Sequence, residues 1–168
     1  MGIRIGLALC LTAGCTLLGK SAGNAARRRS KCLEDMIRAV RLLDTHITDR
    51  CCNVSDSLMK TGYEPFVQSG AEMKNGFSAG EAWARIRQAF YGRRGILDAL
   101  IARDREIVNE LFDGLGGSSR QAQEVLIDSA VRYLSEQHEG ARLQLAEKDR
   151  LYVTVGFLFG LILALAVI

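Results

Sequence analysis

Hydrophobic residues form two long apolar runs near the ends of the 168-residue chain and a spaced pattern between them. Residues 151–168 contain no charged side chain. Eighteen helical residues rise about 27 Å, close to the ~30 Å hydrocarbon thickness of a bilayer. In the shorter run at residues 3–19, Arg4 lies near the edge, where its side chain can reach the headgroups. The pattern predicts transmembrane helices at residues 1–20 and 151–168, with a helical domain at residues 21–150.

The middle segment begins with the spacing of an amphipathic helix. Residues 32–47 alternate between an apolar and a charged face, and the apolar positions are Leu33, Met36, Ile37, Val40, Leu43 and Ile47. A short helix is predicted around Leu58 with Ser55 as its cap, and another after Pro65. Each of these helices needs a partner for its apolar face.

Three further helices are predicted at residues 79–90, 96–101 and 105–115. A last helix is predicted to run from Arg120 into the second apolar run, with Gly140 as its only breaker. Its apolar positions are Val125, Ile127, Leu134, Leu143 and Leu145. The predicted fold class is therefore all-α, a compact bundle of about six helices flanked by N- and C-terminal transmembrane helices.

Local start and stop signals support these boundaries. Ser78 and Glu81 have the spacing of a capping box, in which each side chain bonds the other residue's amide. Asp104 is a candidate cap for the helix that follows it. The remaining signals are a turn at Asn75-Gly76, a helix end at Gly116-Gly117, and a cap at Ser118 or Ser119.

The near balance of acidic and basic residues argues against nucleic-acid binding. All 19 acidic residues and every basic residue except Arg4 lie between Lys20 and Arg150, so the middle segment is nearly neutral. A nearly neutral domain lacks the basic excess that phosphate binding requires. A single proline and an aromatic content of 7% further favour helices over a turn-rich β fold.

Basic residues flank both apolar runs on their inner sides. Arg27, Arg28, Arg29 and Lys31 follow the first run, and Arg142, Lys148 and Arg150 precede the second. Because cytoplasmic flanks are enriched in lysine and arginine, we expect a cytoplasmic middle domain, with both termini on the far side of the membrane. The odd number of cysteines is a poor disulfide framework and suits a reducing compartment.

Two sequence features favour other hypotheses. Thr12-Ala13-Gly14-Cys15 looks like a lipobox, although its first position usually carries an aliphatic residue; it would make the protein an exported ligand-binding lipoprotein anchored through Cys15. His46, Cys51 and Cys52 could form a soft-metal or thiol site in a membrane-tethered sensor. Adjacent cysteines rarely ligate one tetrahedral ion, so apolar or solvent-facing cysteines are the simpler interpretation.

No catalytic, metal-binding or cofactor-binding residues stand out, and we expect a protein that is not an enzyme. The glycines at residues 114–117 lack the lysine and the preceding strand of a phosphate-binding loop. Four carboxylates follow Ile101 at helical spacing, but arginines between them indicate a solvated helix; they are Asp104, Glu106, Glu110 and Asp113. Trp83, on an amphipathic helix, is expected in the core.

Several short motifs together resemble the stage III sporulation protein AB family of endospore-forming bacteria, and the resemblance covers nearly the whole chain. The positions that carry it are Gly80, Glu81, Trp83, Asp104, Glu106, Leu115, Gly116, Gln123, Tyr152, Gly156 and Gly160. One departure is visible at Cys52-Asn53-Val54, where the family tends to have Thr-Pro-Leu. The resemblance implies that these positions serve the structure or a partner interface.

The resemblance also implies a function without catalysis. Its cytoplasmic domain would be similar to that of the type II secretion platform protein, and would dock a cytosolic secretion-type ATPase. Other stage III sporulation membrane subunits would assemble around it, in a channel complex at the mother-cell membrane around the forespore. Assembly of several copies of the chain is compatible with such a platform, and no cofactor is implied.

Overall fold

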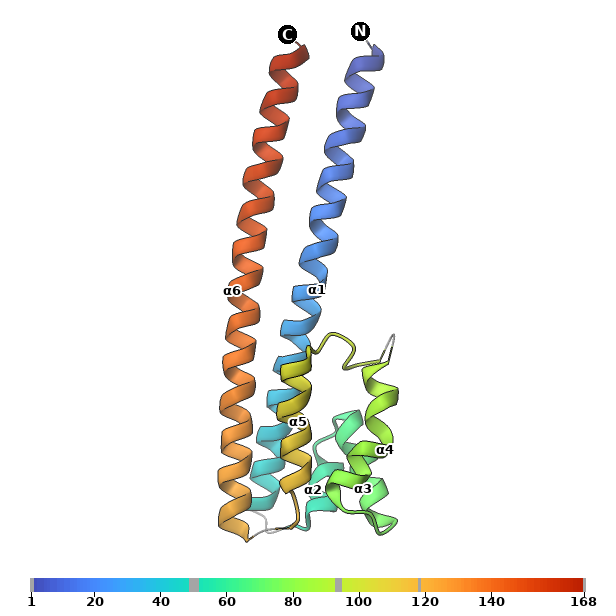
Figure 1. Cartoon of the computed structure of the whole chain (residues 1–168), viewed down its shortest axis with the longest axis vertical. Coiled ribbons are helices and arrows are strands. Elements are labelled where there is room, and N and C mark those ends of the chain that lie inside the picture. The colour runs from blue at the N-terminus through green and yellow to red at the C-terminus, as the bar shows by residue number, and fades with distance from the viewer. Residues whose placement is uncertain (1, 49–51, 93–94, 118, 168) are drawn as a thin grey trace. The chain divides into compact units, whose positions relative to one another are not determined.

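The computed structural model describes the backbone of residues 2–48, 52–92, 95–117 and 119–167, and this part of the chain consists of helices and the loops between them, with no strand (Figure 1). Its helices are α1 (Gly2–Thr48), α2 (Val54–Lys60), α3 (Glu64–Lys74), α4 (Ala79–Tyr91), α5 (Ala102–Gly114) and α6 (Arg120–Val167). The prediction of an all-α fold is therefore confirmed for the described residues. The prediction of about six bundle helices flanked by two separate helices differs from the structure, because α1 and α6 each include an apolar run and a helix of the middle segment, which gives six helices in the described part.

The chain divides into two compact units, residues 1–28 with 140–168, and residues 29–139. The first unit contains the beginning of α1 and the end of α6. The structure does not describe the side chains of residues 1–24, nor those of residues 147–168 apart from Val155. The predicted spans at 1–20 and 151–168 fall there, together with Tyr152, Gly156 and Gly160. A search of the described residues finds no helix with the length and apolar character needed to cross a bilayer.

The second unit, residues 29–139, is built around the apolar stripe of α1. Every apolar position predicted for residues 32–47 is buried, and the most deeply buried are Leu33, Met36, Val40 and Leu43. The helical period was visible in the sequence because the opposite face carries charges at regular intervals. The helix prediction for this segment is therefore confirmed, including the face that it buries.

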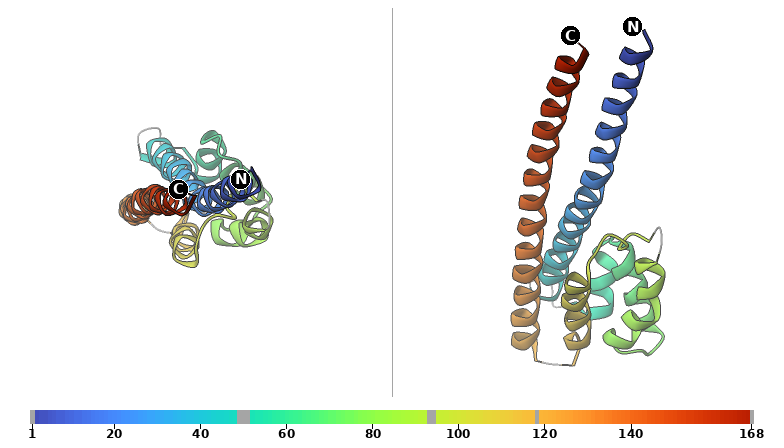
Figure 2. Two further views of the ribbon diagram at one scale, coloured as in Figure 1. Left: turned by 90° about the horizontal axis from the view of Figure 1, so that it is seen from above. Right: turned by 45° about the horizontal axis from the view of Figure 1, so that its top comes forward.

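Three aromatic residues join α3, α4 and α5 at the centre of this unit. Trp83 of α4 stacks on Phe112 of α5 with ring centroids 4.4 Å apart and planes 4° apart. Phe66 of α3 meets Phe112 edge-on at 5.3 Å. The Trp83 indole N–H donates to Asn109 Oδ1 at 2.8 Å, so its polar atom is also satisfied. Consecutive short helices are thereby packed on one another, α2 on α3, α3 on α4 and α4 on α5 (Figure 2).

The start of α2 differs from the prediction. Asn53, rather than Ser55, is the N-cap, and its side chain accepts a hydrogen bond from the Ser55 amide. The Ser55 hydroxyl is buried and donates to the Gly70 carbonyl of α3 at 2.8 Å. Both residue types cap helices well, so the choice depends on packing against α3, which the local sequence does not reveal.

The segment predicted as a helix at residues 96–101 is instead a series of turns. The Leu97 amide donates to the Phe90 carbonyl, and the Asp98 amide donates to that of Gly95. Six residues make little more than one helical turn, so tertiary bonds to α4 outweigh local helix formation here. Helix α5 then begins at Ala102, with Asp104 at its third position rather than as its cap; its carboxylate accepts from the Ile101 amide at 3.1 Å.

Helix α6 begins after Ser119, whose hydroxyl accepts from the Ala122 amide. It continues without interruption to Val167, as the absence of a proline predicted. Of the apolar positions predicted on α6, Ile127 and Leu134 are buried, but Val125 and Leu143 are exposed. The buried stripe also uses small and polar side chains, namely Gln123, Ala130 and Ala141, which an apolar pattern alone overlooks.

Gly70 provides a stability prediction because α2 and α3 cross closely there. A Cβ atom at Gly70 would lie 2.7 Å from the Ser55 backbone oxygen and 2.8 Å from Met59 Cγ. We expect Gly70→Ala to lower the free energy of unfolding by about 1–3 kcal/mol, as overpacking usually does. Gly140→Ala is the matched control: nothing lies within 4 Å of its added Cβ, so better helix propensity should raise stability by up to about 1 kcal/mol. Urea unfolding of the full chain in detergent followed by circular dichroism measures both, and equal effects at the two glycines would contradict the packing.

Candidate functional site

Two adjoining grooves lie at one end of the second unit, where α4 begins, α5 ends and α6 begins. The first, which we term the α4/α5 groove, has a volume of about 470 Å³. Its lining residues are Met73, Ser78, Ala79, Gly80, Glu81, Ala84, Asp113, Leu115, Gly116 and Gly117. It therefore follows the first turns of α4 and the last turn of α5.

Local chemistry explains the shape of the α4/α5 groove. The capping box predicted for Ser78 and Glu81 is present, and the hydrogen bonds that Ser78 donates hold the pKa of the Glu81 carboxyl below its ordinary value. A Cβ at Gly80 would come within 2.6 Å of Asp113 Oδ1, so glycine lets α4 approach α5. Gly116 has a φ of 84°, a left-handed conformation that favours glycine and turns the chain after α5.

The second groove, which we term the α1/α6 groove, has a volume of about 390 Å³. Its lining residues are Ile47, Cys52, Asn53, Val54, Met73, Gly116, Arg120 and Gln123. Met73 and Gly116 line both grooves, so the two adjoin. The first groove carries the carboxylates of Glu81 and Asp113, whereas the second carries the guanidinium of Arg120.

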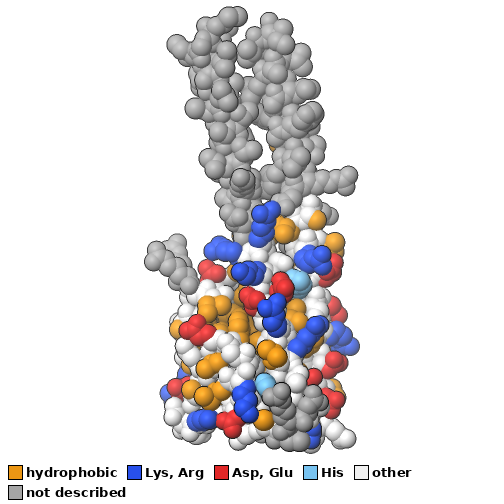
Figure 3. All heavy atoms as spheres, turned by 180° about the vertical axis from the view of Figure 1, so that it is seen from behind, with side chains coloured by type: hydrophobic (Ala, Val, Ile, Leu, Met, Phe, Trp, Pro, Cys, Tyr) orange, Lys and Arg blue, Asp and Glu red, His pale blue; other side chains and the backbone are white. Residues whose placement is uncertain are grey.

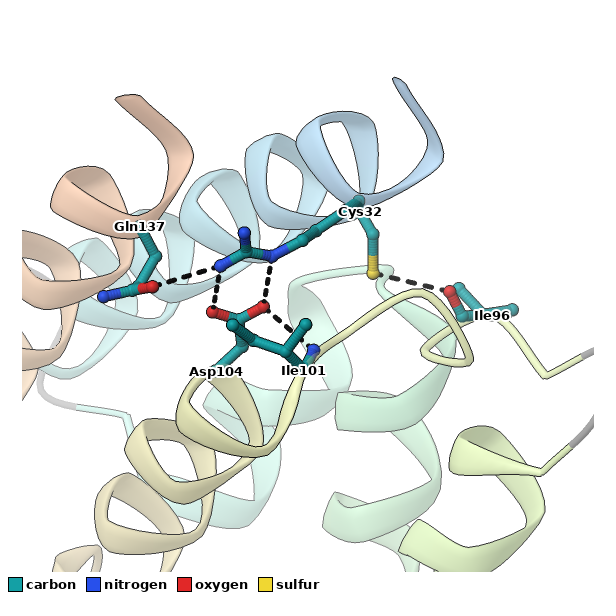
Figure 4. A network of polar contacts seen from close by, with 6 residues as sticks. Cys32, Ile96, Ile101, Asp104 and Gln137 are labelled. Atoms are coloured by element: carbon teal, nitrogen blue, oxygen red, sulfur yellow. Dashed lines mark hydrogen bonds and ion pairs between the residues drawn. The ribbon is translucent and has the colours of Figure 1, made fainter. Parts of the chain in front are cut away.

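A buried ion pair lies at the other end of α5 and joins three helices (Figure 4). The Arg29 guanidinium of α1 donates to both carboxylate oxygens of Asp104, at 2.8 and 2.9 Å, and to Gln137 Oε1 of α6 at 3.1 Å. The Asp104 side chain is 0% exposed and that of Arg29 is 12% exposed. The hydrogen bonds with Asp104 raise the pKa of Arg29 above its ordinary value.

The ion pair fixes the relative positions of α1, α5 and α6 within the second unit. A bidentate pair whose carboxylate also accepts from the Ile101 amide, and whose guanidinium also donates to Gln137, is a geometry in which two buried charges are tolerated. Sequence reasoning found Asp104 as a family-motif position but missed Arg29 and Gln137, which lie 75 and 33 residues away. Arg29 belongs to the basic cluster after the first apolar run, which the sequence analysis attributed to a cytoplasmic flank. No local signal therefore distinguished Arg29 from its basic neighbours.

A family model described as stage III sporulation protein AB matches residues 4–168. The chain belongs to this family. The match gives the protein a role connected with sporulation and confirms the resemblance drawn from the short motifs. No curated protein and no solved structure matches the chain.

Five of the family-motif positions meet at the two grooves. They are Gly80, Glu81, Leu115, Gly116 and Gln123. Of the others, Trp83 and Asp104 are buried in the second unit, as described above. Glu106 is exposed and pairs with Arg103 at 2.7 Å, on the side of α5 turned away from the core. The described positions that carry the resemblance therefore fall into three groups: five line the grooves, Trp83 and Asp104 are buried between helices, and Glu106 is exposed.

The carboxylates of α5 do not converge on a common point. Asp104 is buried against Arg29, Glu106 is paired in solvent, and Asp113 lies beside Gly80. Acidic and basic side chains are also interspersed over the face of the molecule in Figure 3, with apolar side chains between them. Asp104, Glu106 and Asp113 therefore do not form one cluster, whereas Asp113 shares the α4/α5 groove with Glu81 of α4.

The proposed sensor residues are only partly placed by the structure. The Cys52 amide donates to the His46 carbonyl at 3.2 Å, and Lys60 Nζ donates to Cys52 Sγ at 3.3 Å. Cys51 lies outside the described residues, as does the Cys15 side chain on which the lipoprotein hypothesis depends. Within the described part of the chain, no group of three or more His, Cys, Asp or Glu side chains is arranged to hold a metal ion.

Cys32 gives a prediction about pH and chemical reactivity. Its thiol is buried and donates to the Ile96 carbonyl at 3.4 Å, and burial raises its pKa from 9.0 to about 12. Because the folded-state pKa is raised, the stabilisation is complete below about pH 9 and is lost as the pH rises towards 12.

We therefore expect Cys32 to resist iodoacetamide at pH 8 in the folded protein and to react once urea has unfolded it. The experiment uses a full-length variant in which the other cysteines are serine, namely Cys10, Cys15, Cys51 and Cys52. Cys32→Ala in the same background should show a smaller loss of stability between pH 9 and 11. Rapid alkylation of folded Cys32 would contradict its burial.

Proposed function

We propose that this family member is a non-enzymatic membrane platform subunit of a sporulation channel complex, and that it docks a cytosolic secretion-type ATPase. Residues 1–20 and 151–168 would span the mother-cell membrane around the forespore, with residues 21–150 in the cytoplasm. Other stage III sporulation membrane subunits would assemble around the two spans.

One observation supports this proposal most strongly: five of the positions that carry the family resemblance line two adjoining grooves at one end of the second unit. The α4/α5 groove is bordered by the acidic Glu81 and Asp113 and adjoins a groove bearing the basic Arg120, a charge pattern that a protein partner of complementary charge would recognise. Of the two carboxylates in the α4/α5 groove, Glu81 is engaged in the capping box with Ser78, and no group of three or more metal-ligating side chains is arranged to hold an ion among the described residues. Positions that shape a surface without such chemistry are better explained by a partner than by a substrate.

Two further features fit a platform. The apolar runs have membrane-spanning length, and basic residues flank both on their inner sides. Helix α6 extends from Arg120, in the wall of the α1/α6 groove, to Val167, near the end of the second apolar run. The Arg29–Asp104–Gln137 network fixes α6 to α1 and α5. A partner held in the grooves would therefore be coupled through one helix to the second apolar run.

The direct experiment fills the α4/α5 groove without disturbing the core. Ala84 is exposed, and a Cβ at Gly117 meets nothing within 4 Å, so Ala84→Arg and Gly117→Arg should fold normally. We expect the double variant to bind the cognate ATPase at least about tenfold more weakly than the wild type, because a blocked groove removes central contacts. Copurification of the full-length protein in detergent with the tagged ATPase measures this, together with spore counts of a strain carrying only the variant.

Ala89→Arg is the matched control, since Ala89 is an exposed alanine on the same helix but lies outside the grooves. It should leave ATPase binding and spore formation unchanged. Full ATPase binding by the groove variant would refute the docking site. Absence of binding by the wild-type protein, together with normal sporulation of a deletion strain, would refute the platform function itself.

A further inference from the structure

The α4/α5 groove carries two carboxylates and, among the described residues that line it, no cation. Glu81 lies in the first turn of α4 and Asp113 in the last turn of α5, and both residues are exposed. A Cβ atom at Gly80 would lie 2.6 Å from Asp113 Oδ1, so the Asp113 carboxylate is next to the helical turn that carries Glu81. Two acidic side chains from different helices therefore border one groove.

Neither carboxylate is neutralised by a cation within the described part of the chain. Glu81 accepts hydrogen bonds from the Ser78 amide at 2.9 Å and the Ser78 hydroxyl at 2.8 Å, and these hold the pKa of its carboxyl below the ordinary value and keep it charged. The Asp113 side chain makes no hydrogen bond or ion pair among the described residues. The groove therefore presents two negative charges to whatever enters it.

The cations that follow lining residues in the sequence are engaged elsewhere. Lys74, after Met73, pairs with Asp56 of α2 at 2.9 Å. The Arg85 guanidinium, after Ala84, lies 3.7 Å from the centre of the Phe77 ring, and it lowers the pKa of Glu81 less than the hydrogen bonds from Ser78 do. Arg120 lines the adjoining α1/α6 groove and not this one. The negative charge of the α4/α5 groove is thus left for a partner to balance.

The rest of the groove is mostly apolar or small. Met73 is half-buried, Leu115 is buried, and alanines and glycines supply most of the remaining lining. The methylene groups of a lysine or arginine can pack on such a surface while the cationic head meets a carboxylate. An acidic segment would be repelled by the two carboxylates, and a wholly apolar one would cover them without any compensating bond. The composition of the groove therefore favours a long basic side chain.

We propose that the α4/α5 groove takes a lysine or arginine side chain from the partner protein, with its methylene groups against Met73 and Leu115 and its cationic head at the carboxylates of Glu81 and Asp113. The inference rests on the docking in the proposed function and adds the chemistry of the partner's surface. A groove that selects by shape alone would accept a neutral side chain of the same length, whereas this one requires a positive charge. Exposed charges of this kind act mainly on the association rate and on the choice of partner.

The test removes the two charges and keeps the shape of the groove. In the double variant Glu81→Gln, Asp113→Asn, the glutamine can still complete the capping box with Ser78, so the fold should be retained and circular dichroism checks it. Biolayer interferometry with the full-length protein in detergent measures binding of the cognate ATPase. We expect binding to be about tenfold weaker, mainly through slower association, and to depend less on salt up to about 0.5 M.

Glu110→Gln with Glu136→Gln is the matched control, because it removes two exposed acidic side chains that line neither groove and changes the net charge equally. It should leave binding within about twofold of the wild type. Equal binding by the wild type and the groove variant would overturn this inference and leave the docking function standing, and equal losses in both variants would overturn it as well. A wild-type protein that does not bind the ATPase refutes the docking function, and this inference with it.

A charge exchange identifies the basic side chain itself. Peptides that tile the cognate ATPase are screened for binding to the full-length protein, and the bound segment should contain a lysine or arginine whose replacement by glutamate abolishes binding. Asp113→Lys should weaken the native peptide and restore part of the binding of the glutamate peptide. A bound segment without a basic residue would contradict the proposal, and so would a glutamate peptide that Asp113→Lys does not rescue.

Discussion

Replacement of Asp104 by alanine is expected to lower the free energy of unfolding by about 3–5 kcal/mol, because it leaves the Arg29 guanidinium buried without its partner. In the native protein Arg29 gives two of its N–H groups to this carboxylate, and only 12% of its side chain is exposed to water. The variant also removes the acceptor of the Ile101 amide at the start of α5. Urea unfolding of the full chain in detergent, followed by circular dichroism, gives the midpoint and the slope from which the loss is calculated.

A double variant separates the cost of an unpaired charge from the value of the pair. Arg29→Met with Asp104→Ala removes both charges, and we expect it to recover most of the stability lost in Asp104→Ala alone. The exposed pair Arg103–Glu106 is the control, since both side chains are more than half exposed and Arg103→Ala should cost less than about 1 kcal/mol. Similar losses for Asp104→Ala and Arg103→Ala would mean that Arg29 is well solvated, contrary to the structure.

The sequence was sufficient to predict the helices because their signals are local. The apolar stripe of α1 and the Ser78–Glu81 capping box repeat at intervals of three and four residues, and the structure has both as predicted. The predictions fail where contacts between distant parts of the chain determine the local structure. The segment at residues 96–101 bonds to Phe90 and Cys32 rather than to itself, and Ser55 bonds Gly70 instead of capping its own helix.

The sequence identified several residues of the candidate site, but it did not predict that they lie close together in the folded protein. Gly80, Leu115 and Gln123 were selected through the family resemblance, and only the folded structure shows that they line adjoining grooves. No spacing rule connects them, because the grooves form where the beginning of α4, the end of α5 and the beginning of α6 meet. Arg29 was missed for the opposite reason: its local context already had an explanation, and its partner lies 75 residues away.

Trp83→Ala is the second substitution with a large expected effect, about 3–5 kcal/mol of lost stability, since it empties the position at which α4 stacks on α5. Trp83→Phe keeps an aromatic ring against Phe112 but loses the indole donor to Asn109, and should cost about 1–2 kcal/mol. Tyr133→Ala, at an exposed aromatic side chain of α6, should change stability by less than about 1 kcal/mol. Because Trp83 is the only tryptophan, circular dichroism must follow the unfolding of these variants.

The same variants decide what the family-motif tryptophan does. Trp83 is 1% exposed, so a partner cannot touch it, and its replacement can affect docking only by unfolding or loosening the unit. Under the proposed docking function, we therefore expect Trp83→Phe to bind the proposed ATPase partner as the wild type does at temperatures where it stays folded, while Ala84→Arg with Gly117→Arg weakens this binding at unchanged stability. The opposite result, weak binding by a fully folded Trp83→Phe, would show that α4 changes its packing when the partner binds. In that case the stack of Trp83 on Phe112 would belong to the docking mechanism as well as to the core.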